Sequence, residues 1–74
     1  MTRTIASPIE VMDVNGLTVV LTAGIEIRHE HQSFIIEDGN RVDFWVFEAR
    51  VDPDNCMSGG WEVFTSDSEP LVRS

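Results

Sequence analysis

From Ile25 to His31 the residues Glu, Arg and Glu alternate strictly with isoleucine and histidine, which is the period of a β-strand with one half-buried face and one solvated face. Turn-forming residues bound this segment and the other β-favouring segments of the chain. No window of eleven residues sustains the 3.6-residue period of an amphipathic helix. The pattern therefore predicts an all-β fold, with at most a short helical turn near residues 53–58.

Asn15-Gly16 lies between two β-favouring runs, residues 9–14 and 17–22, and is a strong signal for a hairpin turn. A two-residue loop here aligns Met12 with Val19, because paired residues of a hairpin lie directly opposite each other. In this register one face carries Met12, Val14, Leu17, Val19 and Leu21. We therefore expect a β-hairpin over residues 9–22.

A second turn is predicted at Glu37-Asp38-Gly39, where Gly39 suits the left-handed position of a three-residue loop. That register predicts one continuous core face made of Phe34, Ile36, Val42, Phe44 and Val46. Trp45 and Phe47 then lie on the other face, either in a second layer of a closed barrel or in an exposed contact patch. With a last strand at residues 61–65, we expect five or six antiparallel strands in a small barrel or a strongly twisted sheet.

The 74 residues are expected to form one small acidic domain, residues 1–74, with a polar and flexible tail at 66–74. Cys56 is the sole cysteine, so no disulfide within the chain is possible, and the first residues contain no apolar stretch of signal-peptide length. The longest apolar run, residues 44–47, is far shorter than the roughly 20 residues that span a bilayer. These features predict a cytoplasmic protein that does not contact membranes.

Charge narrows the classes of partner. Thirteen carboxylates stand against five arginines, lysine is absent, and the formal net charge is −8. Direct binding to nucleic acid is disfavoured, because neutralisation of phosphates by basic side chains supplies most of that affinity. The natural complement is a basic protein, or a protein complex that itself binds nucleic acid.

The leading hypothesis is a small acidic inhibitor or decoy that blocks the nucleic-acid site of such a partner. This is the strategy of DNA-mimic inhibitors, such as the anti-CRISPR and anti-restriction proteins of phages. The predicted partner-binding residues are Asp43, Trp45, Phe47, Glu48, Asp52, Asp54 and Glu62. The alternative is a homodimeric interaction or assembly module that associates through the face of Trp45 and Phe47, so either a monomer or a homodimer fits the sequence.

Chemistry on a substrate or a metal is the weakest hypothesis. His29 and His31, two residues apart on a strand, would point the same way and could share a metal in a small barrel. Cys56 lies in a loop rich in carboxylates, which disfavours the reactive thiolate. We therefore expect no enzymatic activity, no catalytic residue and no cofactor.

Overall fold

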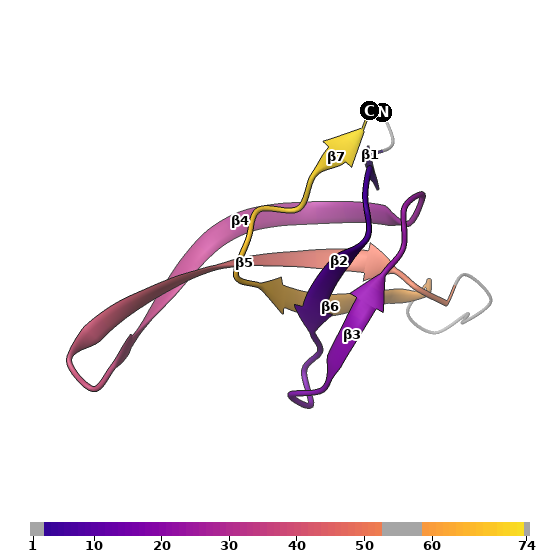
Figure 1. The fold of residues 1–74 in the computed structure, drawn as a ribbon. Helices are drawn as coiled ribbons and strands as arrows, with labels where there is room; N and C mark the ends of the chain where they lie inside the picture. The colour runs from indigo at the N-terminus through magenta and orange to yellow at the C-terminus, as the bar shows by residue number, and fades with distance from the viewer. Residues whose placement is uncertain (1–2, 53–58, 74) are drawn as a thin grey trace.

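A computed structural model describes residues 3–52 and 59–73 of the chain. Seven antiparallel strands form one sheet in the order β3-β2-β6-β5-β4-β1-β7 (Figure 1). The strands are β1 (Arg3–Ile5), β2 (Ile9–Met12), β3 (Thr18–Leu21), β4 (Glu26–Glu37), β5 (Asn40–Arg50), β6 (Trp61–Ser66) and β7 (Val72–Arg73). The predicted all-β fold with a twisted antiparallel sheet is confirmed.

The sheet curls around a small core but does not close into a barrel. Phe47 and Phe64, directly opposite each other on β5 and β6, form a tilted ring pair in this core, with ring centroids 6.4 Å apart. Ile5 from β1 and Leu21 from β3 belong to the same buried cluster, although their strands lie toward opposite ends of the sheet. Strong curvature is therefore needed to bring them together, while the outermost strands β3 and β7 stay unpaired with each other.

The strand count exceeds the prediction because two short strands escape sequence patterns. β1 and β7 contain three residues and two residues, too few for an alternation to be recognised. They pair with each other, with Ile5 opposite Val72, so the first and last described strands lie side by side (Figure 1). The segment 66–74, expected to be a flexible tail, thus contributes a strand, and the helical turn expected near 53–58 falls outside the described residues.

The predicted register of the first hairpin is wrong by one residue. The loop is Val14-Asn15-Gly16, with Gly16 at φ 82°, and Met12 pairs with Thr18 instead of Val19. The Asp13 carboxylate selects this longer loop, since its Oδ1 accepts the backbone N–H groups of Asn15 and of Leu17, both at 2.9 Å. The shift turns Val11 into the core and leaves Met12 and Leu17 exposed.

The second hairpin is also shifted by one residue from its prediction. Asp38 (φ 52°) and Gly39 (φ 79°) are both left-handed, which makes a two-residue type I′ turn closed by Glu37 and Asn40. The predicted core face is consequently divided between the two sides of the sheet. Phe34 and Ile36 share the side of Trp45 and Phe47, whereas Ile35 shares the opposite side with Val42, Phe44 and Val46.

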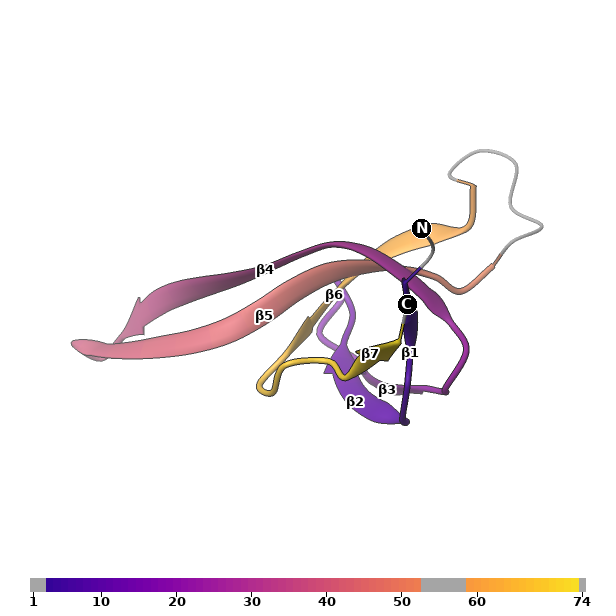
Figure 2. The ribbon, with the colours of Figure 1, turned by 90° about the horizontal axis from the view of Figure 1, so that it is seen from above.

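Strands β4 and β5 extend well past their neighbours. β1 pairs with β4 only at Glu26 and Ile27. β6 pairs with β5 only from Trp45 to Arg50, so residues 40–44 of β5 have no partner on that side among the described residues. Beyond these points the chain continues as a two-stranded ribbon that bends away from the body (Figures 1 and 2). We call residues 33–44 the distal hairpin; it stretches the molecule to 42 × 26 × 19 Å.

The outcome for the two aromatic residues of β5 follows from this architecture. Phe47 is only 1% exposed and packs within the core, while Trp45 is half-buried. The interpretation of Trp45 and Phe47 together as an exposed contact patch is therefore wrong, because the curled sheet covers Phe47. Within residues 3–52 and 59–73, no helix has the length and apolar character required to cross a membrane.

Candidate protein-binding surface

The distal hairpin exposes large apolar side chains that the rest of the described chain leaves uncovered. Phe34 is 51% exposed, Ile35 48%, Ile36 63% and Val42 39%. Phe34 and Ile36 lie on one face of the ribbon, and Ile35 and Val42 form a directly opposed pair on the other. Both faces of this ribbon therefore carry exposed apolar side chains, although Arg41 and Asp43 share the face of Phe34 and Ile36. A solvated ribbon normally keeps at least one polar face.

The ribbon also has two free edges. Among the described residues, no strand pairs with the outer edge of β4 from Arg28 onward or with the outer edge of β5 from residue 40 to residue 44. An isolated two-stranded hairpin is at best marginally stable in water, and unpaired edges are templates for another strand. Contiguous exposed apolar surface of this kind marks interaction sites in soluble proteins.

A cleft of about 530 Å³ separates the distal hairpin from the β2–β3 hairpin. Residues 65–67, at the end of β6, also line it. Figure 1 shows the distal hairpin and the β2–β3 hairpin diverging from the body of the sheet. Its apolar lining comes from β2 on one wall and from the distal hairpin on the other: Val11 and Met12, and Ile35, Val42 and Phe44. This volume lies within the range of about 300–1,000 Å³ that is usual for ligand sites.

Three carboxylates also line the cleft, Glu10, Glu37 and Asp67, and none of them has an ion-pair partner among the described residues. The arginines are engaged elsewhere. Four of the five lie within 4 Å of a carboxylate, in the pairs Arg3–Glu30, Arg28–Glu48, Arg41–Asp43 and Arg50–Glu26. Internal pairing thus engages most of the arginines, and no arginine of the described chain lines the cleft, so the charges at the cleft are negative.

A second cluster of polar side chains lies at a β-bulge in β4, where the pairing with β5 shifts between Arg28 and His31. His29 takes a left-handed backbone conformation there (φ 56°), and its Nδ1 lies 2.5 Å from Oε2 of Glu48. The guanidinium of Arg28 donates to Oε1 of the same carboxylate from Nη2 at 3.1 Å. Hydrogen bonds from His29 and Arg28 lower the pKa of Glu48 below its ordinary value of 4.5.

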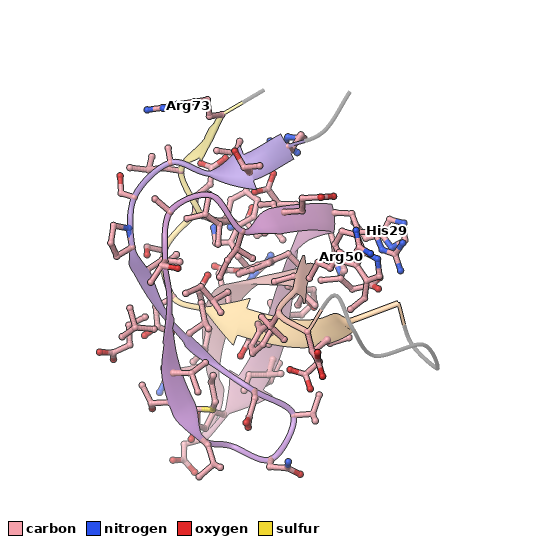
Figure 3. The ribbon with its side chains drawn as sticks, turned by 90° about the vertical axis from the view of Figure 1, so that its right-hand side faces the viewer. His29, Arg50 and Arg73 are labelled. Atoms are coloured by element: carbon pink, nitrogen blue, oxygen red, sulfur yellow. The ribbon has the colours of Figure 1, made fainter. Side chains whose placement is uncertain are left out.

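Contacts around this bulge indicate a structural role. The Arg28 guanidinium also stacks on the Trp61 ring, 4.0 Å from its centroid, which ties β4 across β5 to β6. His29 and Arg50 lie on one side of the molecule, away from Arg73 (Figure 3). Bulges bend a strand locally, so this cluster fixes the direction in which the distal hairpin leaves the body.

The predicted metal pair does not share one environment. His31 Nδ1 lies 3.0 Å from the carbonyl oxygen of His29, whereas His29 faces Glu48. The bulge between the two histidines breaks the alternation on which the prediction rested. No group of three or more His, Cys, Asp or Glu side chains suited to a metal occurs in the described part of the chain, which does not include Cys56.

The predicted partner-binding residues are dispersed over the molecule. Asp43 is exposed on the distal hairpin, but its Oδ1 accepts from Nε of Arg41 at 2.9 Å. Glu48 belongs to the bulge cluster, and Asp52 and Glu62 are exposed near the other end of the sheet. Asp54 lies outside the described residues, so the predicted set does not form one surface in this structure.

Sequence reasoning missed the apolar residues of the distal hairpin as a contact surface. A signal was present, because Phe34-Ile35-Ile36 is a run of three apolar residues that ends directly at an acidic turn. Such a run places apolar groups on both faces of a strand, and it needs a cover on both sides. Here the described chain provides none, which distinguishes a contact element from a core strand.

Comparisons with known proteins identify no relative of this chain: no family model matches it, and neither curated proteins nor solved structures include a significant match.

Proposed function

We propose that this protein is a small acidic binding protein, without enzymatic activity, that uses the distal hairpin to occupy a basic surface of another protein. The observation that carries the proposal is the set of exposed apolar side chains in residues 33–44, on a ribbon that no other strand flanks in the described structure. Its side chains supply the apolar contact area that binding hot spots require. The surrounding carboxylates speed the encounter with a basic partner.

The basic surface that fits best is the nucleic-acid site of the partner, so that the protein acts as an inhibitor or decoy. Eight net negative charges lie on a body only 42 Å long, and most of the arginines are neutralised internally. A folded acidic surface loses less conformational entropy on docking than a flexible acidic tail does. It would therefore compete effectively with a polyanion for the same groove.

A displacement assay tests this function. The purified protein is titrated into complexes of DNA-binding effector proteins with fluorescent DNA, and release of the DNA is followed by fluorescence anisotropy at low and at high salt. We expect release by at least one effector class, weakening as salt screens the charges. Absence of release from every complex would refute the decoy function.

Substitutions distinguish binding through the apolar side chains of the distal hairpin from binding through the negative charge of the whole protein. The double substitution Phe34→Ser and Ile36→Ser removes exposed apolar area from the distal hairpin, and we expect displacement to fall at least tenfold. The matched control is Val14→Ser and Leu17→Ser, which removes exposed apolar side chains, 78% and 62% exposed, from the turn of the first hairpin. Equal losses in the two variants would contradict a specific role for the hairpin.

A self-associating assembly module remains the second candidate, favoured by the free edges of β4 and β5. Its interface would be the distal hairpin, since Phe47, which the sequence suggested as a contact residue, is buried. Sedimentation at several protein concentrations distinguishes the two: a concentration-dependent dimer that Phe34→Ser and Ile36→Ser abolish would support the assembly module.

A further inference from the structure

We propose that the cleft beside the distal hairpin captures an extended basic segment of the partner, which adds as a strand to the free edge of β5. This inference rests on the proposed function and specifies the kind of partner segment that the acidic surface recognises.

The free edge of β5 faces the cleft. β6 pairs with β5 from Arg50 down to Trp45 and then ends at Ser66, so the line that β6 would follow is vacant beside residues 40–44. Glu37 and Asn40 close the two-residue turn, so the N–H and C=O groups of Asn40 point toward β4. Along β5 the direction of these groups alternates from one residue to the next. The peptide groups of Arg41 and Asp43 consequently point toward the vacant line, where they can pair with an added strand.

The walls of the cleft select the side chains of that strand. Met12 borders it on one side, and Ile35, Val42 and Phe44 border it on the other. Successive side chains of a strand point to opposite faces, so every second residue of the added segment would face these apolar groups. Two consecutive inward positions in the segment should therefore be apolar, as Val and Ile are.

The unpaired carboxylates select the charge. Glu10, Glu37 and Asp67 line the same cleft and have no ion-pair partner among the described residues. A second copy of this chain is a poor occupant, because residues 33–44 carry three acids against one arginine and each chain has a net charge of −8. Arginine or lysine flanking the apolar positions complements the site.

A synthetic probe tests this inference on the complete chain. The probe is the acetylated and amidated peptide Arg-Thr-Val-Thr-Ile-Thr-Arg, titrated into isotope-labelled protein while backbone amide shifts are recorded by NMR. We expect saturable shifts at Arg41, Asp43 and Thr65, the residues that border the vacant line. Shifts confined to Gln32, Phe34 and Ile36, on the outer edge of β4, or no saturable shifts, would overturn the assignment.

Matched charge variants test the carboxylates. Glu10→Gln, Glu37→Gln and Asp67→Asn together should weaken probe binding about tenfold, because each contact is a partly exposed ion pair. The control changes three exposed acids away from the cleft, Asp52→Asn, Glu62→Gln and Glu69→Gln, and should weaken it less than twofold. Equal weakening would mean that net charge, and not the cleft, attracts the probe. Far-UV circular dichroism of each variant confirms that the fold persists.

Backbone methylation tests strand addition. Two probes are compared, methylated at the odd-numbered or at the even-numbered peptide nitrogens, so that each has one of its two hydrogen-bonding edges blocked. One of them should no longer bind, and the other should keep a Kd within about threefold of that of the unmethylated probe. If both methylated probes bind alike, the probe docks only through side chains. That result would refute strand addition but not the proposed function. The proposed function would still hold if the original chain releases DNA from an effector and the variant with Phe34→Ser and Ile36→Ser does not.

Discussion

The contrast between Phe47 and Phe34 gives the sharpest prediction about the fold. Both are aromatic residues on paired strands of one hairpin, and they lie on the same side of the sheet. Phe47 is 1% exposed and contacts Phe64 in the core, whereas Phe34 is 51% exposed and lies under the Arg41 guanidinium, 4.2 Å from the ring centroid. Replacing each by alanine should therefore have very different effects on the free energy of unfolding.

The magnitudes follow from the buried areas. Phe47→Ala removes a fully buried ring and leaves a cavity, which costs about 3–5 kcal/mol. Phe34→Ala removes a ring that is half in water, which costs about 1 kcal/mol, and the exposed cation–π contact adds about 0.5 kcal/mol. A 74-residue domain is stable by only about 4–11 kcal/mol, so Phe47→Ala should remove a large part of that stability, whereas Phe34→Ala should remove much less.

Urea unfolding followed by far-UV circular dichroism measures this difference. With a slope of about 1 kcal/mol per molar urea, Phe34→Ala should lower the midpoint by about 1.5 M and Phe47→Ala by about 3 M or more. Equal destabilisation by the two variants would refute the reasoning, because Phe34 would then belong to the core. So would a Phe47→Ala protein with the midpoint of the original chain.

Three further results are expected. Gly39→Ala should destabilise the protein by about 1–2 kcal/mol in urea unfolding, since a Cβ disfavours the left-handed φ of 79° that the turn requires. Gly39→Asn should cost less, because asparagine tolerates this conformation better than alanine does. An unchanged urea midpoint for Gly39→Ala would contradict the turn assignment. The lowered pKa of Glu48 means that its ionised form stabilises the fold above pH 4.5 and that this contribution disappears as pH falls through the lowered pKa. The stability difference between the original chain and Glu48→Gln should therefore shrink between pH 6 and pH 3, and a constant difference would argue against the ionised contact. Arg28→Ala should make the emission of Trp61 sensitive to added quencher by uncovering one face of the ring, and a quenching constant unchanged from that of the original chain would mean that the ring is not covered.

The fold class could be predicted from the sequence because turn residues and alternation report directly on strands. Asn15-Gly16 and Asp38-Gly39 both mark real hairpin turns. Register could not be predicted, because loop lengths depend on contacts that the pattern does not reveal. In the first hairpin the Asp13 side chain captures two backbone N–H groups and lengthens the loop by one residue.

In the second hairpin the apolar pattern itself is ambiguous. Phe34-Ile35-Ile36 and Phe44-Trp45-Val46-Phe47 are continuous apolar runs, so either register buries a plausible set of side chains. Only the strand neighbours decide which residues are covered: β6 and the rest of the core enclose Phe47, and nothing in the described chain encloses Ile36.

The candidate surface was predictable only in its charge. The excess of acids is visible in the composition, but their distribution depends on which carboxylates the arginines neutralise. The cleft brings Glu10 and Asp67, distant in sequence, together with Glu37 across the gap left by the end of β6. Such a gap arises because neighbouring strands differ in length. The residue at which a strand ends cannot be read reliably from the alternation of apolar and polar residues.

The most direct test of the central claim removes the distal hairpin and measures binding. Residues 34–43 are replaced by Asn-Gly, so that Ser33 and Phe44, which face each other in the ladder, flank a two-residue turn. No residue of the buried core cluster lies in the deleted segment. The account predicts a shortened protein that still folds, as judged by far-UV circular dichroism and a cooperative urea transition, and that no longer displaces DNA from an effector that the full chain inhibits. A folded, shortened protein that still displaces the DNA would contradict the account.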